Sequence, residues 1–160
     1  MSSPIKATLK RTESGLVAFL AVKGHYSLIP TSFGKLYGWI FEKGYKPFGP
    51  AITVYYNIPG EVPVNELRWE LRSRIAGEIA PNGPDENGLG VKRVESIQVA
   101  STLHIGPYEK LEGTYRSLME WVDKNGYLTV GPPEELYFND PGKTPPEELR
   151  TEIQFPVKKK

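Results

Sequence analysis

The chain has 160 residues, enough for one domain with its own core or for two small halves that share a core, and too few for two independent domains. Lysine and arginine number 20 against 19 aspartates and glutamates, so the formal charge of +1 excludes an overall field that would attract nucleic acid or an anionic membrane. The sequence has no cysteine, which excludes disulfides, thiolate metal sites and thiol nucleophiles.

The opening residues form no apolar leader, and no run approaches the roughly 18 apolar residues that a membrane-spanning helix needs. We therefore expect a soluble, cytoplasmic protein with no membrane partner and no direct nucleic acid binding. The absence of cysteine agrees with a reducing compartment.

The sequence contains an internal repeat. Shifting it by 82 positions aligns Leu16–Arg72 with Gln98–Gln154 without a gap, and 19 of the 57 pairs are identical. The identical pairs include the glycines and prolines of several turns, so the register holds along the whole alignment and chance is a poor explanation. A repeat of this kind predicts two copies of one structural unit.

Each copy predicts the order strand, helix, strand, strand. The first strand is a mainly apolar run with β-branched residues that ends before a glycine, Val17–Lys23 in the first copy and Val99–Ile105 in the second. The helix is indicated by apolar residues spaced i, i+3 or i+4, and i+7, namely Phe33, Leu36, Tyr37 and Ile40, and then Leu111, Tyr115, Leu118 and Val122. Gly44 and Gly126 follow these helices at the position of a left-handed C-cap.

The third strand lies between a Gly-Pro step and an Asn-x-Pro-Gly turn, at Ala51–Asn57 and Glu134–Asn139. The fourth strand alternates charged and apolar residues, at Glu66–Arg72 and Glu148–Gln154, as a half-buried antiparallel strand does. Additional strands are expected before each copy, at Ile5–Leu9 and Val91–Ile97.

These elements predict an α+β fold in a single domain over residues 1–160, with a first copy at about 5–76, a linker at about 77–90 and a second copy at about 91–157. Neither copy is large enough to bury a core well alone. We expect the copies to pack about a pseudo-twofold axis, with antiparallel sheets, two long helices and a ligand cleft at their junction.

The third strand of the second copy contains a carboxylate and a phenol that are candidates for ligand binding. A period of two places Glu135 and Tyr137 on the same face. The first copy keeps the tyrosine as Tyr55 but has Thr53 in place of the acid, so Glu135 and Thr53 are expected to face each other across the cleft. The alternative is structural, with Glu135 satisfied by an arginine or a tyrosine hydroxyl.

Several segments of the second copy resemble the GyrI-like small-molecule-binding domains, which are the effector-binding domains of multidrug-responsive bacterial transcription regulators. The segments are His104–Tyr108, the helix end at Trp121–Tyr127, the Gly-Pro-Pro-Glu-Glu-Leu-Tyr run at Gly131–Tyr137, and Thr151–Pro156. The resemblance spans about Thr8 to Val157. It implies an aromatic cleft for amphipathic, cationic or aromatic compounds, with Glu135 as the matching anchor. No helix-turn-helix pattern precedes the domain, so the resemblance is to the stand-alone form.

We therefore favour a binding domain for sensing or sequestering a small molecule. Its predicted ligand-binding residues are Glu135, Tyr137, Tyr55, Thr53, Trp69, Tyr108, Tyr26 and Trp39. Each of these aromatic residues has a competing interpretation as ordinary core.

Two alternatives remain open: a hydrolase of small reactive compounds with Glu135 as acid or base, and a protein-interaction module like the gyrase-inhibitor members of the family. No nucleophile motif is present, so an enzyme is the less favoured interpretation. The expected partners are a small-molecule ligand and a DNA-binding or other protein. No cofactor and no metal are expected, because His25 and His104 lack spaced ligand partners.

Overall fold

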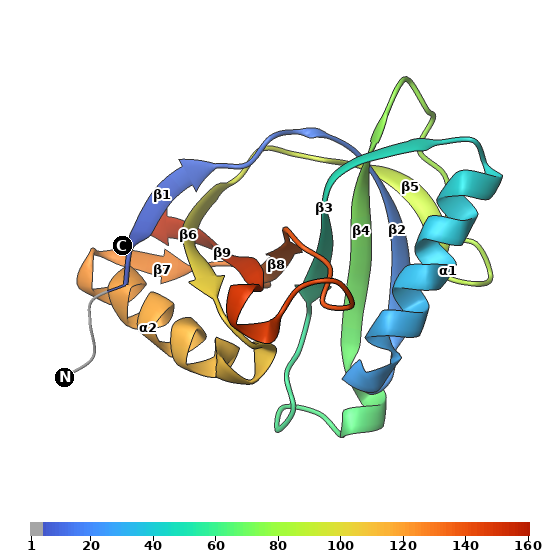
Figure 1. Cartoon of the computed structure of the whole chain (residues 1–160). Coiled ribbons are helices and arrows are strands. Elements are labelled where there is room, and N and C mark those ends of the chain that lie inside the picture. The colour runs from blue at the N-terminus through green and yellow to red at the C-terminus, as the bar shows by residue number, and fades with distance from the viewer. Residues whose placement is uncertain (1–4) are drawn as a thin grey trace. The chain divides into compact units, whose positions relative to one another are not determined.

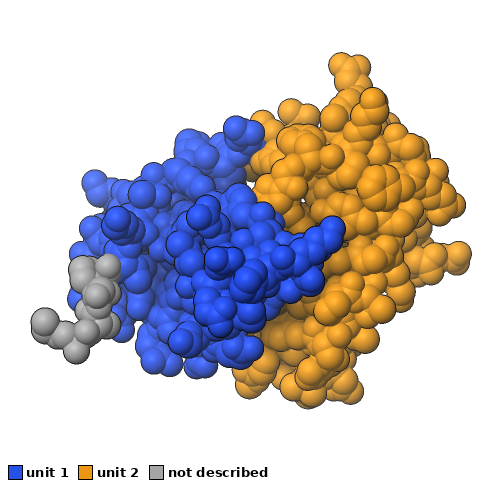
Figure 2. All heavy atoms as spheres, in the orientation of Figure 1, with its two compact units in different colours: residues 1–13, 96–160 blue, residues 14–95 orange. Residues whose placement is uncertain are grey.

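The structure is a computed structural model that describes residues 5–160, so the first four residues of the predicted domain lie outside the description. The chain forms two compact units, coloured separately in Figure 2. Unit 1 combines Met1–Glu13 with Ser96–Lys160, and unit 2 is the continuous segment Ser14–Glu95.

Unit 2 is an antiparallel sheet with one helix. In chain order it contains β2 (Gly15–Lys23), α1 (Ile29–Glu42), β3 (Lys46–Tyr55), β4 (Arg68–Ala76) and β5 (Leu89–Val94). The strands pair in the order β3-β4-β2-β5, as Figure 1 shows.

Unit 1 has the same plan. It contains β1 (Ala7–Arg11), β6 (Gln98–Ile105), α2 (Leu111–Lys124), β7 (Tyr127–Thr129), β8 (Glu134–Tyr137) and β9 (Arg150–Lys159). The strand order is β1-β6-β9-β8, and β7 adds to the far end of β9. The predicted α+β fold with a duplicated unit, antiparallel sheets and two long helices is confirmed.

The outermost strands are exchanged between the copies. In sequence β1 comes just before β2 of the first copy but pairs with β6 of the second, while β5 comes just before β6 of the second copy and pairs with β2 of the first. Both additional strands were predicted, but their partners were not. The strand β5 starts at Leu89, inside the predicted linker, and ends at Val94.

Each helix covers one face of the sheet in its own unit. On α1, Leu36 and Ile40 are completely buried and pack with the β-strand residues Leu20 and Leu71. On α2, Leu118 and Val122 pack with Ile153, Phe155 and Val157 of β9. The apolar spacing in the sequence had predicted both faces.

The strand bounds differ from the predictions at several ends. The strand β3 begins at Lys46, earlier than predicted, and its pairing with β4 is irregular between Phe48 and Ile52. The fourth strands, β4 and β9, extend past their predicted ends to Ala76 and Lys159. Gly44 and Gly126 have φ angles of 76° and 81°, so the predicted left-handed helix ends are confirmed. Within residues 5–160, no helix is long and apolar enough to cross a membrane.

Candidate ligand-binding site

The face of the unit 1 sheet that α2 covers holds the predicted acid. Glu135 on β8 lies beside Ile153 of β9, and Tyr137 lies beside Thr151. Ile153 belongs to the core under α2. Because alternate strand residues share a face, Glu135 and Tyr137 are on the helix side of the sheet.

Glu135 is a buried carboxylate held by two phenols. Its residue is only 7% exposed. The Tyr115 hydroxyl on α2 donates to Oε2 at 2.6 Å, and the Tyr137 hydroxyl donates to Oε1 at 2.7 Å. Hydrogen bonds to an ionised group are shorter and stronger than neutral ones, so this pair of donors suits a charged carboxylate.

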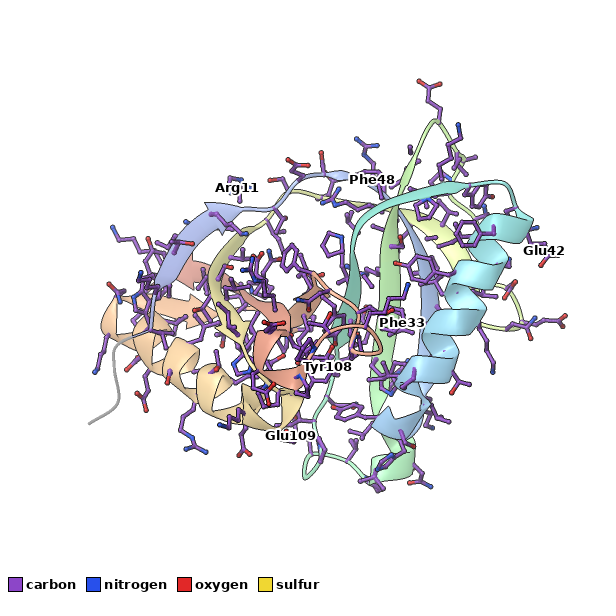
Figure 3. All side chains as sticks on the ribbon, in the orientation of Figure 1. Arg11, Phe33, Glu42, Phe48, Tyr108 and Glu109 are labelled. Atoms are coloured by element: carbon purple, nitrogen blue, oxygen red, sulfur yellow. The ribbon has the colours of Figure 1, made fainter. Side chains whose placement is uncertain are left out.

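Aromatic rings extend from this carboxylate to the surface. Tyr115 meets Phe155 edge to face, with 5.7 Å between ring centroids, and Tyr137 meets Tyr108 in the same way at 6.1 Å. Tyr108 lies in the 3₁₀ turn just before α2, as Figure 3 shows, and is 37% exposed. We call Glu135, Tyr108, Tyr115, Tyr137 and Phe155 the Glu135 site.

Two carboxylates act on the hydroxyl of Tyr108 at the exposed end of the Glu135 site. Burial raises the pKa of the Tyr108 hydroxyl, and the nearby carboxylates of Glu135 and Asp140 raise it further. A negative charge disfavours loss of a proton from the neighbouring phenol and favours the approach of a cation.

Unit 2 has no counterpart of the acid. Thr53, completely buried, stands where unit 1 has Glu135, and Phe33 stands where unit 1 has Tyr115. Tyr55 replaces Tyr137 and meets Tyr26 edge to face at 5.2 Å. The carboxylate and one of its phenol donors are therefore both absent from the equivalent positions of unit 2.

The remaining predicted site residues make internal contacts in unit 2. Trp69 is 1% exposed, and its indole N–H donates to the carbonyl of Gly24 at 2.9 Å. The Tyr26 hydroxyl donates to the carbonyl of Asn57 at 3.0 Å. Trp39 meets Tyr45 edge to face at 5.7 Å.

Three of the eight predicted residues, Glu135, Tyr137 and Tyr108, thus come together in unit 1, and the other five lie in unit 2. Ligand binding by any of the eight stays a prediction.

Sequence reasoning treated Tyr115 only as part of a helix face and missed its contact with Glu135. A signal was available, because the repeat aligns Tyr115 with Phe33 and Glu135 with Thr53. Both differences add a polar group to the same copy. A hydrogen-bond donor and a carboxylate acceptor that occur together in one copy of a repeat, and in neither position of the other copy, are candidates for an interaction.

Both histidines make hydrogen bonds within the protein. The His104 ring is buried, with Nδ1 at 2.7 Å from the Thr114 hydroxyl and Nε2 at 3.1 Å from the Pro107 carbonyl. His25 Nδ1 accepts a hydrogen bond from the Ser27 N–H. Within residues 5–160, no group of three His, Cys, Asp or Glu side chains is arranged to hold a metal ion.

The sequence matches the GyrI-like small molecule binding domain over residues 6–75 and again over residues 70–158, so the chain belongs to this family. The two matches correspond to the two copies of the repeat. Comparison with curated proteins gave no match.

Solved structures share the fold. The EcmrR C-terminal domain is 26% identical with a TM-score of 0.81, and the alignment covers 98% of this chain and 99% of that one. In the EcmrR–DNA complex the match is 24% identical with a TM-score of 0.82; the alignment again covers 98% of this chain, which spans 59% of that longer chain.

Two structures of lower sequence identity also share the fold. A hydrolase from Listeria innocua is 14% identical with a TM-score of 0.75, covering 98% of this chain and 94% of that one. SAV2435, described as bound to tetraphenylphosphonium, is 13% identical with a TM-score of 0.57, covering 96% of this chain and 94% of that one.

Proposed function

We propose that this small-molecule-binding domain binds amphipathic, cationic or aromatic compounds, and that Glu135 is the electrostatic anchor of the ligand. The role is sensing or sequestration. The observation that carries the proposal is the burial of Glu135 among aromatic rings with a tyrosine hydroxyl at each carboxylate oxygen.

The physical argument concerns the cost of the buried charge. Removing a carboxylate from water costs several kcal/mol unless hydrogen bonds and an opposite charge offset the loss. Two phenols supply hydrogen bonds to the carboxylate. A ligand cation would add an opposite charge in a region where screening by water is weak, and the surrounding rings would offer it cation–π contacts.

The relatives support the same class of ligand. The SAV2435 structure contains tetraphenylphosphonium, a permanent cation that carries four aromatic rings. The EcmrR domain belongs to a protein whose structure was solved on DNA. The alignment with this chain covers 59% of that protein.

Tetraphenylphosphonium binding, measured by calorimetry, tests the proposal. Glu135→Gln keeps the shape of the side chain and removes its charge, so affinity should fall by about 10- to 100-fold, the range expected for a charged interaction of about 1.5–3 kcal/mol. Glu135→Asp should weaken binding less, because the charge remains.

Glu134→Gln is the matched control. It makes the same change in net charge one residue away, on the opposite face of β8. The proposal fails if Glu135→Gln and Glu134→Gln bind the cation as tightly as the wild type.

Hydrolysis is the second candidate. The Tyr115 and Tyr137 hydroxyls beside Glu135 resemble the groups that polarise a water or protonate a leaving group. The distant similarity to a hydrolase from Listeria innocua points the same way. Turnover of a strained electrophile by the wild type, lost in Glu135→Gln and retained in Glu134→Gln, would favour this candidate over simple binding.

A further inference from the structure

Thr151 is a buried hydroxyl beside the Glu135 site. It lies on β9 between His104 of β6 and Tyr137 of β8, and all three side chains are on the face that α2 covers. Thr151 is 0% exposed, and its Oγ1 has no hydrogen-bond partner among residues 5–160. Buried polar groups in proteins are nearly always paired, so an orphaned hydroxyl at this position requires an explanation.

The polar side chains on either side of Thr151 make hydrogen bonds to other groups. Both ring nitrogens of His104 have partners, the Thr114 hydroxyl and the Pro107 carbonyl. The Tyr137 hydroxyl donates its proton to Glu135.

The first copy, which forms unit 2, shows that the fold does not require this threonine. The repeat aligns Thr151 with Trp69, whose indole fills the core of unit 2 and donates to the Gly24 carbonyl at 2.9 Å. It also aligns His104 with Val22. Unit 1 therefore has a small hydroxyl where unit 2 has a large, satisfied ring, and this exchange occurs in the unit that carries the buried acid.

We propose that Thr151 is a specificity-determining residue of the Glu135 site and accepts a hydrogen bond from an N–H group of the ligand. This inference rests on the proposed function and narrows its ligand class to aromatic cations that also carry an N–H donor. Thr151 is the diagonal cross-strand neighbour of Glu135, a relationship that separates residues by about 7–8 Å. One small aromatic cation can span that distance, with its charge near Glu135 and its N–H group at Thr151.

Two dyes with the same phenothiazinium core test the inference. Thionine carries amino groups with N–H donors, and in methylene blue these amines are fully methylated. Thr151→Val keeps the volume of the side chain and removes the hydroxyl. We expect it to weaken thionine binding by about tenfold, the effect of one hydrogen bond, and to leave methylene blue binding unchanged. Thr151→Ser should retain the preference for thionine.

Thr102→Val is the matched control, because Thr102 lies on the same face but its hydroxyl already donates to the Lys6 carbonyl at 2.8 Å. It should not change the ratio of the two affinities. The thermal midpoint of Thr151→Val should equal or exceed that of the wild type, since the substitution removes an unpaired hydroxyl. If Thr151→Val does not fold, Thr151→Ala supplies the same comparison of the two dyes.

The outcomes separate the inference from the proposed function. Suppose that methylene blue binding depends on Glu135 while neither Thr151→Val nor Thr151→Ala changes the ratio of the thionine and methylene blue affinities. In that case Thr151 does not bind the N–H group of the ligand, and only the inference is wrong. If the wild type binds neither dye, the proposed function fails and the inference fails with it. The same holds if the Glu135→Gln variant binds each dye as tightly as the wild type does.

Discussion

Tyr115 on α2 and Glu135 on β8 are joined by a hydrogen bond of 2.6 Å from the phenol to the carboxylate. The bond connects the helix of unit 1 to its sheet. At the equivalent positions of unit 2, Phe33 and Thr53 provide neither the phenol nor the acid. The two copies share their packing, and they differ in the groups that could recognise a charge.

Tyr115→Phe should destabilise the protein in the absence of ligand. The substitution keeps the ring that packs on Phe155 but removes one donor to a buried carboxylate, so the free energy of unfolding should fall by about 1–2 kcal/mol. Urea denaturation measures the change. Tyr127→Phe in the same unit is the control and should have little effect; equal losses in the two variants would contradict the role of the Tyr115 hydroxyl.

Glu135→Gln should lower the pKa of Tyr108 toward the ordinary value of about 10. Burial is the largest cause of the raised pKa and remains in the variant, but the contribution of the Glu135 charge is lost. Alkaline titration followed by ultraviolet difference spectroscopy, with Tyr108→Phe to identify the signal, measures the shift. An unchanged Tyr108 titration would mean that the charge of Glu135 is not felt at the exposed end of the site.

The ionisation of Glu152 should make the free energy of unfolding depend on pH in the acid range. Burial alone raises the pKa of this carboxyl, but hydrogen bonds from Lys10, Ser101 and Gln154 outweigh burial and hold the pKa below its ordinary value. A lowered pKa in the folded state stabilises the protein above the unfolded value of about 4.3, and this stabilisation is lost as the pH falls through the folded value.

Glu152→Gln should therefore be less stable than the wild type at neutral pH, and the difference should shrink as the pH falls through the lowered folded pKa of Glu152, below which both side chains are neutral. Denaturation curves at several pH values measure the difference, with the exposed Glu147→Gln as the control. A difference that stays constant with pH would show that the ionised form of Glu152 is not the stabilising one.

Trp69→Phe should reduce stability by about 1–3 kcal/mol, because it leaves a space in the core of unit 2 and removes the donor to the Gly24 carbonyl. Trp39→Phe, at a partly exposed position, should cost less. Urea denaturation measures both losses. The expected order would be reversed if the Trp69 indole contributed little to the core.

Local patterns were sufficient to predict the repeat, the two helices and most strands. Apolar spacing along a helix and the Gly and Pro residues at its ends depend on neighbours in sequence, and these signals placed Leu36, Leu118 and the glycine caps correctly. Strand alternation predicted that Glu135 and Tyr137 share a face for the same reason.

Contacts between distant segments were harder to predict. The meeting of Tyr115 with Glu135 depends on how α2 lies across β8 and β9, which no local pattern specifies. Thr151 was passed over because a threonine in the apolar phase of a strand is common. The exchange of β1 and β5 depends on a choice between two equivalent edges, and the repeat itself makes those edges look alike.

Unit 2 is an insertion within unit 1. The strands β1 and β6 meet at their inner ends, where the Thr12 N–H donates to the Ile97 carbonyl at 2.8 Å and the Ile97 N–H donates to the Thr12 hydroxyl at 3.0 Å. The chain passes from unit 1 into unit 2 after Glu13 and back into unit 1 at Ser96, next to the paired ends of β1 and β6. A tight turn from Glu13 to Ser96 would convert β1 and β6 into an ordinary hairpin without interrupting any strand of unit 1.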